Sequence, residues 1–197
     1  MTRETARTWA EISLGNLEHN YRALRSCAPD SKFLATVKAN GYGHGSVPVA
    51  KRLVELGADY LAVACLDEAA ELRRAGIAAP ILVLGYTQPE LAGEVVALDV
   101  TQTVFTPELA QALSEAAGAA GKRAKIHLKA DTGMSRLGVL DHDPQRAAAD
   151  IAALCAMPHL EPDGIFTHFA NADGDEEYTM LQFTRFMDVM KELEEKY

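Results

Sequence analysis

The regular alternation of apolar, strand-like segments with amphipathic, helix-like segments constrains the fold more than any other feature of this sequence. Segments that favour strands begin near residues 33, 60, 81, 101, 124 and 164. Each is followed by a helix-like segment, and several of these end at a glycine such as Gly57 or Gly76. This spacing predicts a parallel sheet with right-handed crossovers. An eight-stranded barrel and an open doubly wound sheet both fit, and both place functional residues after the carboxyl ends of the strands.

A lysine stands where the strand predicted over residues 33–37 meets a glycine-rich loop. From Phe33 to Gly45 the chain reads FLATVKANGYGHG, with Lys38 at the junction. A lysine at a strand end is usually solvated, and its stem covers apolar surface. An ammonium beside apolar walls loses hydration, however, which favours the neutral amine. A neutral amine can attack a carbonyl, so Lys38 is a candidate for Schiff-base chemistry.

The string from Val37 to Gly45 closely resembles the pyridoxal-phosphate attachment motif of the alanine racemases. The resemblance implies that Lys38 carries pyridoxal 5'-phosphate as an internal aldimine and that the Tyr42 hydroxyl reaches the cofactor phosphate. It also favours one of the two folds, because this family has a TIM-type (β/α)8 barrel. Six strand–helix units of such a barrel are expected here. The likeness extends from about residue 8 into the last helix.

Three further positions acquire roles from the same resemblance. In the string DTGMSRLG, glycines flank Arg136, which in the family hydrogen-bonds the phenolic oxygen of the cofactor and helps to orient substrate. The lysine that matches Lys129 is carbamylated in several members and supports that arginine. Such a carbamate is an anion that can pair with a guanidinium. The histidine that matches His168 lies against the pyridine ring, although a lone histidine among apolar residues is more often a core residue.

Two other segments resemble the family in their amino-acid sequence. They are DEAAELR at residues 67–73 and PILVLGY at residues 80–86. We expect both to be architectural. Leu84 is included among the cofactor-binding residues, and Tyr86 is also expected at the rim of the site.

The predicted elements divide the chain into an N-terminal strand and helix over residues 1–30 and a partial barrel over residues 31–197. The first strand is expected over residues 8–14 because apolar and polar side chains alternate there. The last helix, from about residue 176 to 196, carries an apolar stripe that includes Phe183 and Met187 and is expected to face the core. A complete barrel needs about 250 residues. Family members continue with two more units and a mostly β C-terminal domain, so we expect an N-terminal part.

Racemisation requires a proton to leave one face of the substrate and another to return to the opposite face. In the family, the lysine serves one face, and a tyrosine from the C-terminal domain of the partner subunit of a homodimer serves the other. No residue of this sequence matches that tyrosine. We therefore expect the 197-residue chain to be inactive alone.

Composition limits the classes of binding partner and the cellular compartment that we expect for this chain. The formal net charge of −9 argues against nucleic acid or an anionic membrane surface as partner. Three cysteines, far apart in the chain, form neither a metal-ligand spacing nor a disulfide framework, which favours a reducing cytoplasm and no metal site. No apolar run approaches the roughly 20 residues of a membrane span, and the N-terminus lacks the apolar core of a signal peptide.

The favoured function is that of an alanine racemase, which interconverts L- and D-alanine and supplies D-alanine for peptidoglycan. One alternative is another member of the same barrel group: a racemase of another amino acid, a decarboxylase or a non-catalytic pyridoxal-phosphate-binding barrel. A second alternative, of another class, is an inactive truncated barrel that acts only in assembly. An unfinished sheet leaves edges and apolar surface exposed, so low solubility or association is expected.

Overall fold

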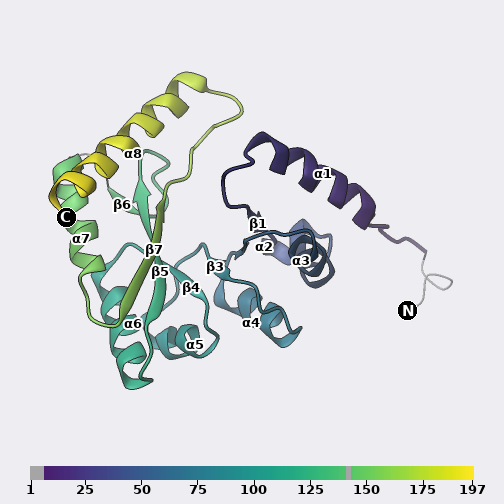
Figure 1. The fold of residues 1–197 in the computed structure, drawn as a ribbon, viewed down its shortest axis with the longest axis horizontal. Helices are drawn as coiled ribbons and strands as arrows, with labels where there is room; N and C mark the ends of the chain where they lie inside the picture. The colour runs from purple at the N-terminus through teal and green to yellow at the C-terminus, as the bar shows by residue number, and fades with distance from the viewer. Residues whose placement is uncertain (1–6, 141–142) are drawn as a thin grey trace.

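Six parallel strands follow one another across a single sheet in the same order as in the sequence. The structure is a computed structural model that describes residues 7–140 and 143–197 (Figure 1). The strands are β1 (Leu34–Thr36), β2 (Tyr60–Val63), β3 (Ile81–Val83), β4 (Thr101–Val104), β5 (Ala124–Asp131) and β7 (Leu160–Phe166). A two-residue strand, β6 (Val139–Leu140), also pairs with β5 in parallel.

The order of the strands distinguishes the two candidate folds. The hydrogen-bonded order is β1-β2-β3-β4-β5, with β7 paired to β5. A doubly wound sheet reverses its strand order at a switch point, whereas a barrel adds each new strand on the same side. The observed order therefore confirms the partial barrel. Within the described residues β1 pairs with β2 alone and β7 with β5 alone, so the sheet is not closed.

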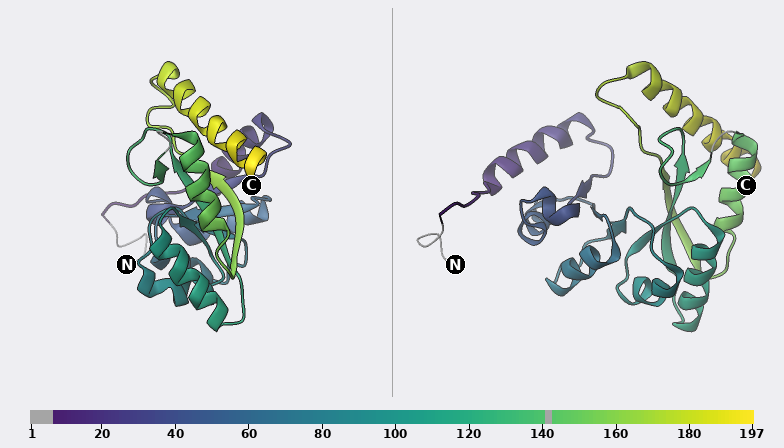
Figure 2. Two further views of the ribbon diagram at one scale, coloured as in Figure 1. Left: turned by 90° about the vertical axis from the view of Figure 1, so that its left-hand side faces the viewer. Right: turned by 180° about the vertical axis from the view of Figure 1, so that it is seen from behind.

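Helices cover the outside of this curved sheet in the order of the chain (Figures 1 and 2). They are α3 (Ser46–Glu55), α4 (Leu66–Arg74), the short pair η1 (Pro89–Leu91) and α5 (Ala92–Ala97), α6 (Pro107–Ala119), α7 (Pro144–Cys155) and α8 (Glu176–Lys196). Sequence signals explain where two of these helices begin: Thr106 caps the N-terminus of α6 ahead of Pro107, and Asp143 caps the N-terminus of α7. No helix in the described part of the chain has the length and apolar character to cross a membrane.

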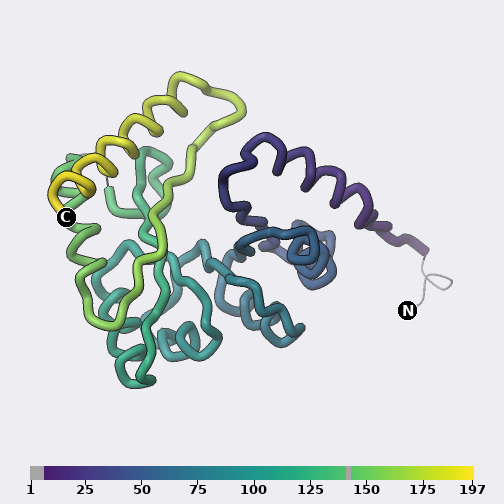
Figure 3. Tube along the Cα trace, viewed as in Figure 1, coloured from purple at the N-terminus to yellow at the C-terminus, as the bar shows by residue number. Residues whose placement is uncertain are grey.

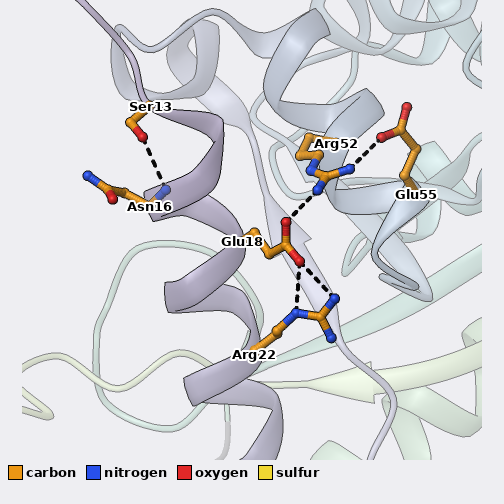
Figure 4. Close-up of polar contacts among 6 residues, drawn as sticks. All are labelled: Ser13, Asn16, Glu18, Arg22, Arg52 and Glu55. Carbon is orange, nitrogen blue, oxygen red and sulfur yellow. Dashed lines mark hydrogen bonds and ion pairs between the residues drawn. The ribbon is translucent and has the colours of Figure 1, made fainter.

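The N-terminal segment differs from the prediction. Residues 8–13 form no strand; helix α1 begins at Leu14 and ends at Cys27. Alternation along residues 8–14 defines two faces, but a strand also needs a neighbour, and the sheet described here offers none to this segment. The helix itself is confirmed. Glu18 forms an ion pair with Arg22 within α1 and another with Arg52 of α3, and the second attaches α1 to the barrel (Figure 4).

The core lies between the sheet and its helices. It contains fully buried aliphatic residues such as Leu61, Ile81 and Leu109. The expected apolar stripe of α8 is only partly buried, because Phe183 and Met187 remain 44% and 47% exposed. Instead, the fully buried residues of α8 are Val189 and the polar Gln182. Figure 3 shows how α8 returns along the outside after a long connection from β7.

Candidate active site

Lys38 lies directly after the first barrel strand, where the backbone changes hand. Val37 is buried, and its N–H donates to the carbonyl of Ala62, which extends the pairing of β1 with β2 by one residue. Lys38 is half-buried. It opens the five-residue turn α2 (Lys38–Tyr42), whose inner residues have left-handed backbone angles. Parallel strands all point the same way, so this lysine stands at the carboxyl edge of the sheet.

The turn after Lys38 is a left-handed helical turn rather than the irregular loop that its glycines suggest. Four consecutive residues have φ between 53° and 61°: Ala39, Asn40, Gly41 and Tyr42. Only glycine, and to a lesser extent asparagine, adopts this region readily. The amide side chain of Asn40 stabilises the turn by accepting from the Ser46 N–H at 2.9 Å. Strained backbone of this kind is characteristic of functional sites.

Lys129 lies near the carboxyl end of β5 and is nearly fully buried, with 4% of its surface exposed. Its ammonium nitrogen lies 4.7 Å from the centroid of the Phe166 ring, in a cation–π arrangement. Burial lowers the pKa of Lys129, and the positive charges of Arg136 and Lys38 lower it further, although Asp131 opposes them. The site therefore favours a neutral amine at Lys129 more than water does.

A tight loop after β5 carries Arg136. The Asp131 carboxylate organises it by accepting from the N–H groups of Gly133 and Ser135 at 3.1 and 3.0 Å. At Gly138, φ is +138°, and an added Cβ would lie 2.5 Å from the backbone nitrogen of Asp131. The loop thus folds back closely onto its own strand and leaves the Arg136 side chain exposed.

His168 completes a cluster of basic groups. It follows β7 and is exposed. Partial burial lowers the pKa of His168, and the nearby charges of Arg136, Lys129 and Lys38 lower it further. Arg136 and Lys38 also influence Lys129, and all four residues stand at or after the carboxyl ends of β1, β5 and β7, so they lie at the same edge of the sheet. Among residues 7–140 and 143–197, no carboxylate forms an ion pair with Lys38, Lys129 or Arg136. The cluster is therefore suited to an anionic ligand.

Helix α8 holds the two loops that carry Arg136 and His168. The buried Gln182 accepts from the Ala170 N–H at 2.8 Å and donates to the Thr132 hydroxyl at 3.2 Å. Tyr178 donates its hydroxyl to the Gly133 carbonyl at 2.8 Å, and Arg185 donates to the Thr132 carbonyl at 3.0 Å. Sequence reasoning missed these residues. The only available signal was a glutamine at a position of α8 where periodicity leads one to expect an apolar residue.

The remaining predicted residues lie beside this cluster rather than within it. Tyr42 is 60% exposed and lines a cavity of about 600 Å³ together with Ile12 and Leu17 of the N-terminal segment. Leu84 is half-buried just after β3, where its N–H donates to the Val63 carbonyl at 2.9 Å. The Tyr86 ring contacts the Phe105 ring, with centroids 6.0 Å apart.

Comparison with known proteins identifies relatives over nearly the whole chain. A family model described as "Alanine racemase, N-terminal domain" matches residues 12–197. Alanine racemase of Desulforamulus reducens is 49% identical over 190 residues, which are 95% of this chain and 51% of that protein. Alanine racemase of Methanococcus maripaludis is 46% identical over 95% of this chain and 50% of that protein. The chain thus spans about half the length of the curated relatives it matches.

Solved structures agree with the sequence matches. Alanine racemase of Clostridium difficile superposes with a TM-score of 0.92 at 39% identity, over 97% of this chain and 50% of that one. The same protein in complex with cycloserine gives a TM-score of 0.93 over 52% of its length. The enzyme from Streptomyces lavendulae, a producer of D-cycloserine, gives 0.85 at 37% identity, over 92% of this chain and 48% of that one. These similarities cover nearly the whole chain.

Proposed function

This chain belongs to the alanine racemase family, through its N-terminal domain, and from that premise we propose that it forms the pyridoxal-phosphate-binding barrel of an enzyme that interconverts L- and D-alanine. The single observation that carries the proposal is that Lys38, Lys129, Arg136 and His168 lie together at the carboxyl edge of the sheet, at or after the ends of β1, β5 and β7. Curated and structural relatives named as alanine racemases support the choice of substrate. The product D-alanine would serve peptidoglycan synthesis.

The donor set of the cluster fits pyridoxal phosphate. The primary amine of Lys38 could form a Schiff base with the aldehyde carbon of the cofactor. The guanidinium of Arg136 could donate paired hydrogen bonds to the phenolic oxygen. The ring of His168 supplies a flat surface for the pyridine ring. We assign the phosphate to the Tyr42 hydroxyl and place Leu84 at the edge of the ring. The excess of positive charge matches a ligand that carries a phosphate and a phenolate.

When bound, pyridoxal phosphate accepts the electrons released when the Cα–H bond of an amino acid breaks. Lys38 would take that proton onto its Nζ on one face of the substrate or return it there. Arg136 would orient the substrate carboxylate by hydrogen bonding. A second acid–base group is needed on the opposite face, and we assign none among the residues that the structure describes.

We also propose that Lys129 takes up carbon dioxide. Its neutral Nζ would form a bond to the carbon of CO2 and release one proton, which leaves a carbamate anion. That anion would pair with Arg136 and fix the guanidinium for the cofactor. The lowered pKa of Lys129, caused first by burial, favours the reacting amine. A carbonyl signal from ¹³C-bicarbonate that disappears in Lys129→Gln would support this assignment, and a signal that persists in this variant would exclude it.

The assembly and the compartment are proposed with the activity. We infer a homodimer, a small amino-acid substrate and no nucleic-acid partner, in keeping with the acidic net charge of −9. We further propose that the enzyme works in the cytoplasm, where free cysteines persist.

Borohydride reduction with pyridoxal phosphate tests the proposal, because it makes any bond between the cofactor carbon and a lysine amine permanent. We expect the label at Lys38, its loss in Lys38→Arg, and its persistence in the matched variant Lys32→Arg, which changes an exposed lysine. D-alanine formation is measured in parallel. Labelling of Lys38 without turnover is expected, since no second base is assigned here. A label scattered over surface lysines would overturn the proposal for this chain.

A further inference from the structure

The carboxylate of Glu68 joins the ends of the first two barrel strands directly beside Lys38. One oxygen accepts from the Ala39 N–H at 2.7 Å, and the other accepts from the Ala64 N–H at 2.7 Å. Ala39 is the residue immediately after Lys38, and Ala64 follows the last residue of β2. Glu68 itself is half-buried in the first turn of α4, where the helix dipole favours a carboxylate.

Both N–H groups need this partner because regular strand pairing ends here. The last bond between the two strands runs from the Val37 N–H to the Ala62 carbonyl, at 2.8 Å. Beyond it, Ala39 enters the left-handed region at φ 53° and turns away from β2. The carbonyl of Ala64 accepts a hydrogen bond from the Gly85 N–H, on the side of the next strand rather than toward Ala39. A side chain with two acceptors replaces the missing strand contacts, and charge-assisted bonds of this kind are stronger than neutral ones.

The far half of the turn has its own anchors, so Glu68 has a separate task. The Asn40 carbonyl accepts from the Gly45 N–H at 2.9 Å, and its side chain accepts from the Ser46 N–H at 2.9 Å. These bonds hold the turn to the start of α3. Glu68 holds the other end, next to the reactive amine, and couples it to β2 and α4.

We propose that Glu68 is a positioning residue for Lys38. By fixing the Ala39 N–H, it holds the strained backbone that sets the direction of the lysine side chain. The inference rests on the proposed function, because it concerns the amine that would bind the cofactor. Glu68 touches no reacting atom and acts through the backbone. Misplacement of a reacting group by about 1 Å can lower a rate roughly a hundredfold.

The test compares Glu68→Gln with Asp67→Asn in the full 197-residue chain. Glu68→Gln keeps the shape but turns an amide NH2 toward one of the two N–H donors. Asp67→Asn removes the same charge from the same helical turn at an exposed residue. The first measurement is the rate of labelling by pyridoxal phosphate and borohydride at Lys38 relative to the exposed Lys32. The second is the amide exchange rate of Ala39 without cofactor.

We expect Glu68→Gln to lower relative labelling of Lys38 by roughly tenfold, the effect of losing one charge-assisted hydrogen bond, and to accelerate exchange at Ala39. Asp67→Asn should change neither quantity. Glu68→Asp keeps two acceptor oxygens on a shorter side chain, so it should recover part of the labelling rate at Lys38. This second variant keeps the test valid even if Glu68→Gln fails to fold. Labelling at the wild-type ratio in Glu68→Gln, or no recovery in Glu68→Asp, would overturn the inference. A wild-type chain whose Ala39 exchanges slowly but that never labels at Lys38 would instead defeat the proposed function.

Discussion

Gly138 determines how closely the loop that carries Arg136 can return to β5. An alanine there would combine a backbone at φ +138° with a Cβ placed 2.5 Å from the Asp131 nitrogen and 2.7 Å from the Ala130 carbonyl carbon. We expect Gly138→Ala to lower the free energy of unfolding by about 3 kcal/mol, from strain and overpacking together. Urea denaturation measures the change.

Gly121→Ala provides the control for Gly138. It has φ +64° but meets no atom within 4 Å, so only the backbone strain applies. Its effect should stay near 1 kcal/mol. Equal losses in the two variants would show that the loop moves to accommodate a Cβ at residue 138.

His127 gives the fold a predictable response to acid. Its ring packs against Tyr60 and Phe166 and lies 3.7 Å from the Asp163 carboxylate. Burial lowers the pKa of His127 below its ordinary value of about 6.5, although Asp163 opposes the shift. The unfolded chain therefore binds more protons, and stability falls as the pH falls through about 6.5 toward the folded-state pKa.

We expect His127→Gln to flatten the dependence of unfolding free energy on pH below 7, by up to about 1.4 kcal/mol per pH unit. Urea denaturation from pH 7.5 to 5.5 measures it. His168, whose pKa is also lowered, leaves a slope of the same sign. His19→Gln, at an exposed site on α1, is the control. An unchanged slope in His127→Gln would mean that Asp163 compensates for burial.

The predicted site residues and the missed ones differ in the range of the interactions that define them. Lys38 and Arg136 stand in continuous strings whose glycines mark the turns around them. Glu68 and Gln182 owe their positions to backbone groups 29 and 12 residues away in the chain. Pairing at such distances depends on how strands and helices pack, which local pattern does not encode. The sequence therefore predicted roles for residues of the cluster but not the residues that support it.

At the scale of elements, periodicity and helix stops located the barrel units well. The last helix, expected from about residue 176 to 196, coincides with α8 (Glu176–Lys196). The strand expected over residues 8–14 was wrong because alternation cannot specify a pairing partner. The stripe on α8 was partly wrong because Gln182, rather than Phe183, turns inward. A buried amide with partners on two loops outweighed apolar burial there.

Gln182 should therefore stabilise α8 on the barrel more than its polar character suggests. Gln182→Leu leaves the Ala170 N–H without its acceptor and removes the donor to Thr132. We expect a loss of about 2–3 kcal/mol in unfolding free energy and faster amide exchange at Ala170. Gln111→Leu makes the same change at an exposed position of α6 and should stay within about 0.5 kcal/mol. Slow exchange at Ala170 in Gln182→Leu would contradict this role.

At the scale of the whole molecule, β1 and β7 each pair with one strand only in the described sheet and so form edges, as does the two-residue β6. Unpaired N–H and C=O groups at such edges are templates for another strand. Leu34 on β1 is 39% exposed, and apolar side chains of α8 such as Phe183 are exposed as well. These surfaces predict that the 197-residue chain associates with itself in solution through strand addition.

A charge at the edge provides the test, because lysine on an edge strand opposes pairing with a second edge. We expect sedimentation of the wild-type chain to depend on concentration, and Leu34→Lys to weaken association about tenfold, which corresponds to 1.4 kcal/mol. Leu24→Lys makes the same change on α1, where the leucine is 62% exposed but belongs to no strand, and should leave association unchanged. A wild-type chain that sediments as a single monomer and melts cooperatively would show that the open edges are protected within the chain itself.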